Sequence, residues 1–447
     1  MSTAIHWFRR DLRLTDNPAL QHAATQADEV LLLYVHAPGE EAPWVPGAAS
    51  RWWLDRSLAA LQTELGEARL ILRAGNSLDE LLGLVRASGA ELVTWNRLYE
   101  PALIARDRRI KAALTDAGCE VRSFRANLLL EPWEVATQAG QPYKVFTPFW
   151  RTARKQLASA GVLPPVHPAP ARDLPSRELE QLALADGRPW TGKLERHWQP
   201  GAAAAMERLD QFIAESLGGY ADDRNRPDRT GTSRLSPYLH FGELSPGQIW
   251  TALAQHEPTH NTESFAAELG WREFAHHLLY HFPQTPERNF NARFDDFPWR
   301  RPGGKDLRAW QRGETGIDFV DAAMRELWDT GWMHNRMRML VGSLLTKNLG
   351  IHWQEGARWF WDTLVDADLA NNTMGWQWIA GCGADAAPYF RIFNPQTQAE
   401  KFDPDGAYRK RWLAGRKRPQ PIIDLGHSRR EALDAYRAIR TPPAGSG

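Results

Sequence analysis

The stretch AIHWFRRDLRLTDNPALQHAATQADEVLLLYVHA, residues 4–37, decides the fold of the first part of the chain. It begins and ends with short apolar runs rich in β-formers, which predict two strands. Between them NPALQHAATQA has helical spacing, and Asn17 or Asp16 ahead of Pro18 is a typical helix start. A strand, a helix and a second strand in this order indicate a parallel sheet with helices packed on its faces.

The same alternation continues to about residue 130. Further strands are predicted at 69–75, 91–96 and 119–130, and further helices at 50–65, 77–89 and 101–118. Ser77 with Glu80 predicts a capping box at the start of the 77–89 helix. We therefore expect an α/β domain over residues 1–132, built on a Rossmann-like, five-stranded parallel sheet.

This predicted domain lacks the glycine motifs of nucleotide-binding α/β proteins. The first strand runs into RRDLRL, residues 9–14, where a dinucleotide site would carry G-x-G-x-x-G. The sequence G-x-x-x-x-G-K-[ST] occurs nowhere in the chain. These absences argue against a dinucleotide site of the Rossmann type and against ATP as the source of the chemistry.

The composition of the chain changes after the α/β part. Residues 162–178, VLPPVHPAPARDLPSRE, are proline-rich and cannot form a long helix or a central strand. Residues 133–200 are therefore predicted to be an interdomain linker. From 201 to 447 almost every segment has helical spacing, for example GAAAAMERLDQFIAESL and TESFAAELGWREFAHHLLYH. The second domain is predicted to be all-α.

Length and composition limit the class of protein. With 447 residues the chain is too long for one hydrophobic core, and its formal net charge is zero. Only local patches can therefore favour a nucleic-acid partner. Two cysteines allow at most one disulfide. No apolar run approaches the ~20 residues of a membrane span, and the N-terminus has no apolar signal core. We expect a soluble, cytoplasmic monomer.

The segment GTSRLSPYLHFGELSP, residues 231–246, gathers hydroxyl groups around a flexible backbone. Thr232, Ser233 and Ser236 follow Gly231 closely. Such a segment can offer backbone N–H groups and hydroxyls to a phosphate. The alternative is an ordinary helix N-cap with a spare serine.

Two other segments place unlike side chains on one helix face, at positions i, i+3 and i+4. The two sets are Glu268, Trp271 and Arg272, and Asn335, Arg338 and Met339. An acid, an indole and a guanidinium on one stripe are not typical of a core; the alternative is a Glu–Arg pair on a solvated face. An amide, a cation and a thioether favour the lining of a polar pocket with a soft wall. The alternative is an amphipathic helix with exposed arginines.

The stretch DADLANNTMGWQW, residues 366–378, combines acids, amides and indoles. Asp366 and Asp368 are two residues apart and cannot face the same way on a helix, so we expect an irregular turn. Asn372 and Trp376 share one face of the helix that follows. Asp-x-Asp can bind Mg²⁺, but no third nearby carboxylate supports a metal. An organic ring with N–H groups and basic nitrogens fits these side chains better.

A basic segment lies near the C-terminus. GAYRKRWLAGRKR, residues 406–418, carries six cations and no acid. Cations with interleaved aromatic residues are typical of a surface that contacts phosphates. The alternative is a solvated segment without a partner.

Taken together, these segments resemble the DNA photolyase and cryptochrome family. The resemblance runs almost from end to end, through WFRRDLRLTDNPAL, GTSRLSPYLHFGELSP, LGWREFAHHLLYHFP, TGWMHNRMRM, DADLANNTMGWQW and DAAPYFRIFNPQTQAEKFD. It implies an α/β antenna domain and an all-α domain that binds U-shaped FAD. It also implies light-dependent repair of cyclobutane pyrimidine dimers in DNA, in which excited FADH⁻ donates an electron to a dimer flipped out of the duplex.

The resemblance assigns cofactor roles residue by residue. The positions similar to FAD-binding residues of the family are Tyr220, Thr232, Ser233, Arg234, Leu235, Ser236, Arg272, Arg338, Asp366, Asp368 and Asn372. Among them, Arg338 and Asp366 match the ion pair beside the isoalloxazine, and Asn372 matches the amide that faces flavin N5. The family's tryptophan chain for photoreduction matches Trp376, Trp353 and, with a one-residue gap, Trp299.

The resemblance also implies a site for the damaged DNA. The matching positions are Glu268, Trp271, Asn335, Arg336, Met339, Trp378 and Arg391. Glu268 resembles the acid that hydrogen-bonds the carbonyls of the dimer. The (6-4) photolyases carry histidines where this chain has Asn335 and Met339, which favours cyclobutane dimers. The alternative is a cryptochrome, a blue-light receptor with little repair activity, but a receptor has no need of a complete dimer pocket.

The resemblance also indicates an antenna chromophore, and the sequence departs from the family at one place near the C-terminus. Glu100 in NRLYEP matches the acid that binds the pterin of methenyltetrahydrofolate, so folate is the expected antenna and 8-hydroxy-deazaflavin is the alternative. No metal site is expected, since two cysteines exclude the iron–sulfur branch, which needs four ligands. In one departure, only AGRKR, residues 414–418, separates RKRWL from PQPII, where relatives carry a longer insert. This difference falls at the rim of the implied DNA groove.

Overall fold

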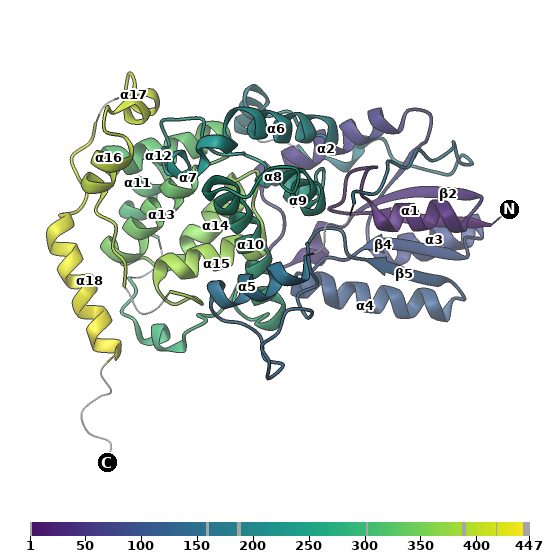
Figure 1. The fold of residues 1–447 in the computed structure, drawn as a ribbon, viewed down its shortest axis with the longest axis horizontal. Coiled ribbons are helices and arrows are strands. Elements are labelled where there is room, and N and C mark those ends of the chain that lie inside the picture. Colours follow the sequence, from purple (N-terminus) through teal and green to yellow (C-terminus); the bar gives the residue numbers. More distant parts are fainter. Residues whose placement is uncertain are drawn as a thin grey trace, which may run out of the picture.

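The computed structural model describes residues 2–157, 161–185, 189–300, 303–386, 390–416 and 418–440. Figure 1 shows a sheet flanked by helices at one end of the molecule and a helical part at the other, with α18 farthest from the N-terminus. The strands are β1 Thr3–Phe8, β2 Glu29–His36, β3 Leu70–Ala74, β4 Leu92–Asn96 and β5 Glu120–Phe124. The prediction of an α/β part followed by a helical part is confirmed.

All five strands pair in parallel, in the order β3-β2-β1-β4-β5. The central strand β1 is buried at every residue, as expected for a parallel sheet covered on both faces. The helices of this part are α1 Pro18–Gln26, η1 Pro38–Glu41, α2 Ala48–Leu65, α3 Ser77–Ser88 and α4 Pro101–Asp116. The strand order reverses between β1 and β4, where open α/β sheets place ligands beyond the carboxyl ends of the strands.

The predicted capping box of α3 is wrong. The N-cap is Asn76, whose side-chain oxygen accepts from two backbone N–H groups of the first turn. Ser77 is instead the first helical residue, and its hydroxyl donates to Glu40 Oε2 at 2.7 Å. Asparagine and serine are both good N-caps, so the sequence alone could not show which of Asn76 and Ser77 caps the helix.

The last strand is shorter than predicted. β5 ends at Phe124, and residues 125–130 leave the sheet. The backbone N–H groups of Leu129 and Leu130 donate to the buried carboxylate of Glu273 in the helical part, at 2.9 and 3.2 Å. A segment that crosses between two domains can have the same apolar composition as a strand. Only its contact with the distant Glu273 shows that this segment is not part of the sheet.

The stretch predicted as a linker contains an α-helix. This helix, α5 Phe146–Gln156, packs against α10. The proline-rich residues 162–178 form no helix or strand, as predicted, and follow the surface of the α/β part. There the N–H of Val166 donates to the carbonyl of Leu14 at 3.1 Å, and Arg172 pairs with Glu29. Two 3₁₀ helices follow, η2 Leu179–Leu182 and η3 Pro189–Arg196.

The helical part is built from α6 Ala202–Glu215, η4 Leu217–Gly219, α7 Tyr220–Asp223, α8 Ser236–Phe241, α9 Pro246–Leu253, α10 His260–His281, η5 Ala292–Asp296, α11 Lys305–Arg312, α12 Asp318–Thr330, α13 Asn335–Ser343, α14 Trp353–Thr363, α15 Leu369–Ala380, α16 Pro395–Phe402, α17 Ala407–Leu413 and α18 Leu425–Arg440. A π-helical segment, Leu344–Asn348, continues α13. Among the described helices, none combines the length and apolar character needed to cross a membrane.

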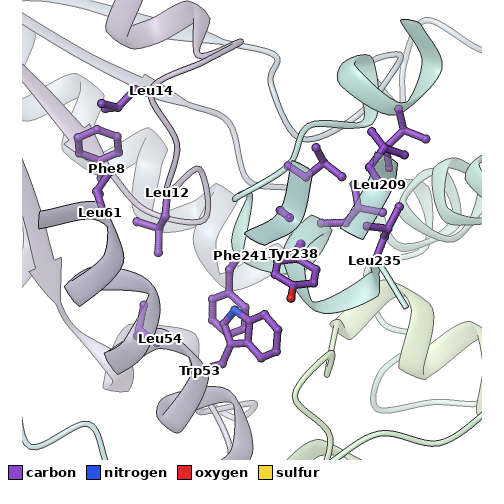
Figure 2. Packing of buried hydrophobic residues seen from close by; sticks show 14 of the residues in the cluster. Phe8, Leu12, Leu14, Trp53, Leu54, Leu61, Leu209, Leu235, Tyr238 and Phe241 are labelled. Atoms are coloured by element: carbon purple, nitrogen blue, oxygen red, sulfur yellow. The ribbon is translucent and has the colours of Figure 1, made fainter. Parts of the chain in front are cut away.

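Trp53 of α2 joins the two parts of the molecule. Its ring lies 5.0 Å from that of Tyr238 and stacks on Phe241 at 6.1 Å, both in α8 (Figure 2). Its Nε1 donates to the buried carboxylate of Glu243 at 3.0 Å, which also accepts from the N–H of Gly201 at 2.6 Å. Burial raises the pKa of Glu243 to about 8. This contact fixes α8, and with it the segment 231–236, against the α/β part.

Candidate functional site

The two acids of the 366–378 stretch lie on the turn between α14 and α15, as their spacing predicts. Asp368 is the N-cap of α15, and its Oδ1 accepts from a backbone N–H of the first turn at 2.8 Å. Asn372 and Trp376 follow one helical turn apart. The side chain of Asn372 donates to a backbone carbonyl of α14 at 3.1 Å. All four side chains are buried.

Three segments meet at the carboxylate of Asp366. Arg338 Nη2, from α13, lies 3.0 and 2.7 Å from its two oxygens. The hydroxyl of Ser236, at the start of α8, donates to Asp366 Oδ2 at 2.6 Å. Arg338 Nε also donates to the carbonyl of Met333 at 2.8 Å, which fixes the guanidinium plane. The structure thus brings together three residues that the resemblance assigned to one cofactor.

Arg234 is held by aromatic rings. Its guanidinium lies 4.4 Å from the ring centre of Trp198 and 4.8 Å from that of Trp332. Its backbone is in the left-handed region, with φ at 54°. Burial lowers the pKa of Arg234 from its usual value, and the carboxylates of Glu326 and Asp366 offset this shift only in part. Such a cation gains from an anionic ligand.

The rest of the 231–236 segment offers polar groups to the same region. Thr232 and Ser233 are half-buried, whereas Leu235 is buried in the core and can offer a ligand only its backbone. Tyr220, at the start of α7, is also buried. A Cβ at Gly231 would lie 2.6 Å from the side chain of Asp223, so glycine allows this segment to pass close to α7.

Helix α10 carries a polar stripe at four-residue spacing, formed by Glu268, Arg272 and His276. Glu268 forms an ion pair with Arg224 of the α7 end. Burial raises the pKa of Glu268, and Arg224 opposes this shift. Arg272 Nη1 donates to the carbonyl of Asn127 at 2.6 Å. Arg272 also lies 3.6 Å from the adjacent carboxylate of Glu273. Glu268 and Arg272 therefore share a face of the helix, but they do not pair with each other.

Two half-buried indoles have flat, rigid neighbours. Trp271 stacks on Phe146 of α5, with ring centres 3.7 Å apart and planes 9° from parallel. Trp378 lies 4.9 Å from the guanidinium of Arg391. Both indoles are only partly covered by protein. They can therefore offer flat surface to a ligand.

The start of α13 is open to solvent. Asn335 is exposed, and Met339, one turn later, is half-buried. Arg336 Nη2 donates to Asn225 Oδ1 at 2.5 Å, and its guanidinium lies 4.6 Å from the ring of Phe402. The predicted DNA contacts on this helix are accessible to a large ligand.

The basic segment 406–418 is partly neutralised by local acids. Arg409 lies 2.9 Å from Asp403, and Arg418 lies 3.1 Å from Asp318. Lys417 lies outside the described residues. The cation count of this segment therefore overstates the charge that a phosphate would meet.

Of the three tryptophans of the predicted electron chain, Trp376 lies on α15, Trp353 begins α14 and Trp299 lies in the loop after η5. Trp376 and Trp353 are buried, and Trp299 is half-buried. The ring of Phe360 lies 5.0 Å from that of Trp376. The ring of His352 lies 5.0 Å from Trp299 and 5.5 Å from Trp353, so it stands beside both.

Glu100 occupies the boundary between the two parts. It is buried and forms an ion pair with Arg10, which also pairs with Glu41. A cavity opens beside these residues, at the carboxyl ends of β1, β2 and β4. Its lining includes Arg10, Glu41, His240 and Trp7, but not Glu100. Glu100 therefore reaches the cavity through the side chain of Arg10.

Sequence reasoning missed four residues of this region. They are Arg224, Trp198, Trp332 and His276. The first three contact their partners across long stretches of sequence, so no local pattern could have revealed them. A signal did exist for His276, because it continues the four-residue spacing of Glu268 and Arg272.

The site fits a flavin dinucleotide. Among the described residues, several buried polar atoms have no hydrogen-bond partner, including Arg234 Nε, Trp376 Nε1, His240 Nδ1 and Asn127 Oδ1. Cations and hydroxyls suit phosphates, while carboxylates and an amide suit the N–H groups of a flavin ring. Within the described ranges, no group of three His, Cys, Asp or Glu side chains is placed to hold a metal ion.

Comparisons with known proteins agree with this geometry. Residues 4–173 match the family model described as DNA photolyase, and residues 265–418 match the FAD binding domain of DNA photolyase. The chain is 42% identical to the deoxyribodipyrimidine photo-lyase of Agrobacterium fabrum over 98% of both chains. It is 38% identical to Cryptochrome-2 of Arabidopsis thaliana over 92% of this chain and 70% of that protein.

A solved structure gives the same result. The crystal structure of a class III photolyase from Agrobacterium tumefaciens superposes with a TM-score of 0.93, at 42% identity, over 98% of each chain. A cryptochrome structure from Synechocystis superposes with a TM-score of 0.87 at 25% identity, over 97% of this chain and 99% of that one. With relatives above 30% identity that it covers almost completely, this chain belongs to the DNA photolyase family.

Proposed function

We propose that this protein repairs cyclobutane pyrimidine dimers in DNA with light absorbed by bound FAD. One observation carries the proposal. Glu268 of α10 and Arg336 of α13 are held by Arg224 and Asn225, which are neighbours in sequence. Two side chains assigned to lesion and DNA contacts on separate helices thus converge at one point, beside the flavin-site ion pair of α13.

FAD would be held by residues from four elements. Arg338 and Asp366 would face the flavin ring, and Ser236 would complete this group. Arg234 and Arg272 would serve the phosphates. Bound and reduced, FAD supplies light-driven transfer of one electron to the dimer and back. The protein binds and orients both reactants.

Glu268 would bind the dimer through its carbonyl groups. A carboxylic acid donates a hydrogen bond to a carbonyl only when it is protonated. Burial raises the pKa of Glu268, which favours the protonated form, and Arg224 opposes it. The bases would pack against Trp271, whose stacking on Phe146 makes it a rigid wall, and against Trp378. Asn335 and Met339 would line the open side.

The tryptophans have a separate role in this proposal. Trp376, Trp353 and Trp299 would return oxidised FAD to its reduced state by passing electrons from the surface. This step prepares the enzyme and is not needed once the flavin has been reduced chemically. The two activities can therefore be measured independently.

We further propose that the cavity beyond the sheet holds the antenna. Several of its lining residues are cations, including Arg9, Arg10, Arg51 and Arg106. Although Arg9, Arg10 and Arg106 are already paired with acids, this charged lining suits a polar chromophore, methenyltetrahydrofolate or, as the alternative, 8-hydroxy-deazaflavin. Glu100 would act by holding Arg10. Absorbance and fluorescence of the chromophores released from purified protein would distinguish the two.

The decisive test uses purified, chemically reduced protein and DNA that carries one cyclobutane thymine dimer. Recovery of thymine absorbance is followed under blue light, with a dark sample as control. Light-dependent recovery is expected. If the protein binds FAD and photoreduces it but restores no thymine, the proposal is wrong and a receptor function of the cryptochrome type replaces it.

A further inference from the structure

The two oxygens of Asp368 have different partners. Oδ1 accepts from the backbone and side-chain N–H groups of Asn371, at 2.8 and 2.7 Å. Oδ2 lies 3.5 Å from His240 Nδ1 and 3.5 Å from His276 Nε2. All three members of this group are buried. A buried carboxylate therefore faces two imidazoles from two other helices.

Hydrogen bonding determines the protonation of His276. Its Nδ1 lies 3.0 Å from the carbonyl oxygen of Arg272, one helical turn earlier. A carbonyl can only accept, so Nδ1 carries a proton. If the ring were neutral, Nε2 would be unprotonated. Two hydrogen-bond acceptors, Nε2 and the carboxylate of Asp368, would then face each other. The doubly protonated imidazolium satisfies both sides.

His240 does not meet the same condition. Its Nδ1 has no hydrogen-bond partner within the described part of the chain, and it also lines the antenna cavity. We therefore assign the charge to His276.

The neighbouring charges agree with this assignment. Burial works against a charged imidazole, but Asp368 outweighs burial and the pKa of His276 is raised. Burial likewise opposes ionisation of Asp368, but His276 and His240 lower its pKa well below the usual value. The other charged or titratable groups acting on this pair are Arg10 and Glu100 of the α/β part, Arg272 and Glu273 of α10, and His240 of α8.

We propose that His276 is a charged positioning residue, which as an imidazolium keeps Asp368 ionised and fixes its Oδ2 at the start of α15 for FAD. This inference rests on the proposed role of Asp368 as an FAD ligand. His276 acts through Asp368 and need not touch the cofactor. Helix α10 would thus carry three residues with different roles on one stripe. Glu268 would bind the lesion, Arg272 the phosphates of FAD, and His276 would hold Asp368.

The first test reads the charge directly. Ring nitrogens of ¹⁵N-histidine-labelled holoprotein are observed by NMR at neutral pH, and His276 is assigned by the signal that disappears in His276→Gln. Both of its nitrogens should be protonated. An unprotonated Nε2 at neutral pH would overturn the proposal. If His276→Gln does not fold, selective assignment through His276→Arg serves the same purpose.

The second test measures FAD affinity against pH for the wild type, His276→Gln, His276→Arg and the exposed control His256→Gln. Wild-type affinity should fall as pH rises through the raised pKa of His276, since the imidazolium is then lost. His276→Gln should bind FAD roughly tenfold more weakly at neutral pH, without this pH dependence. His276→Arg should restore binding and also lack the fall.

The outcomes separate this inference from the proposed function. If His276→Gln binds FAD with the wild-type affinity and the wild-type pH profile, His276 does not position Asp368 for FAD. This conclusion would hold whether or not the protein repairs DNA. A wild type that binds FAD with the expected pH profile but repairs no dimer would instead refute the repair function and leave the His276 assignment standing.

Discussion

The carboxylate of Glu268 and the guanidinium of Arg224 form an ion pair between helix α10 and the end of α7. The two residues are 44 positions apart in the sequence, and neither has another ion-pair partner among the described residues. Arg224 therefore orients the acid that is proposed to hold the dimer. Binding of a dimer would require Glu268 to exchange this cation for two base carbonyls.

Replacing Glu268 by alanine should lower repair and spare the cofactor. Loss of a hydrogen bond to an ionisable group costs roughly 1.5–3 kcal/mol, so the affinity for dimer-containing DNA should fall about tenfold or more and the repair yield should fall with it. The measurement is thymine recovery per absorbed photon, together with the FAD content of the purified variant. Glu263→Ala is a matched control, because Glu263 lies on the same helix in an exposed ion pair with Arg154. Loss of FAD from Glu268→Ala would show that Glu268 belongs to the cofactor site.

The α/β part could be predicted almost entirely from local pattern. Most strands and helices there are flanked by polar or glycine residues, and β1 with β2, β2 with β3, and β4 with β5 are neighbours both in the sequence and in the sheet. The error at residues 125–130 has a physical cause, since their backbone is bonded by Glu273 in the other domain. Likewise, helix α5 could not be foreseen in a stretch whose proline-rich half dominated its composition.

The site was predictable only where its residues share one helix. Glu268 with Arg272, and Asn372 with Trp376, follow from four-residue spacing. The contact of Arg234 with the rings of Trp198 and Trp332 could not be predicted, because these three residues lie far apart in the sequence. From spacing alone, these residues could belong either to a ligand site or to an ordinary polar surface. The resemblance to the photolyase family is what assigned them to a ligand site.

Trp376→Phe should separate photoreduction from repair. Trp376 Nε1 has no hydrogen-bond partner among the described residues, so phenylalanine removes the indole without breaking a bond. Photoreduction of oxidised FAD in the presence of an external reductant should slow at least about tenfold. Chemically reduced Trp376→Phe should repair dimers like the wild type. The exposed Trp133 offers the control Trp133→Phe. Normal photoreduction in Trp376→Phe would exclude this residue from the electron chain.

Two glycines test how tightly Trp376 is packed. A Cβ at Gly356 of α14 would lie 2.0 Å from the indole of Trp376, whereas a Cβ at Gly375 of α15 would meet nothing within 4 Å. Gly356→Ala should therefore displace the indole, lower the melting temperature by several degrees and slow photoreduction, since overpacking costs about 1–3 kcal/mol. Gly375→Ala should be neutral or stabilise its helix. Equal melting temperatures for the two variants would contradict this packing.

Binding to dimer-containing DNA should weaken steeply with salt. Each phosphate neutralised by a cation releases counterions, so the logarithm of the affinity falls linearly with the logarithm of the salt concentration. Arg336→Ala should make this slope shallower by about 1. Arg69→Ala, which removes an exposed cation paired with Asp173 in the α/β part, should not change it. A salt-independent affinity would exclude a basic DNA surface.

The buried Glu243 at the domain boundary predicts how stability depends on pH. An unfolded chain releases its proton near pH 4.5, whereas burial raises the pKa of the folded state to about 8. Between these values the folded state holds more protons, so the free energy of unfolding should fall as pH rises through this range. Glu243→Gln cannot ionise, and it should lose less stability over the same range.

The comparison is made by denaturant unfolding at several pH values. At acid pH both proteins present a neutral group to Trp53 and Gly201, but the glutamine amide has one acceptor oxygen for these two N–H donors, so Glu243→Gln should be the less stable of the two by a constant amount. Towards pH 8 and above, the wild type must hold a charge that no nearby cation among the described residues offsets, so its stability should fall relative to that of Glu243→Gln. Glu257→Gln, at an exposed position, should follow the wild type throughout. Parallel pH profiles for Glu243→Gln and the wild type would mean that Glu243 stays ionised in the folded protein, satisfied by the N–H groups of Trp53 and Gly201 alone.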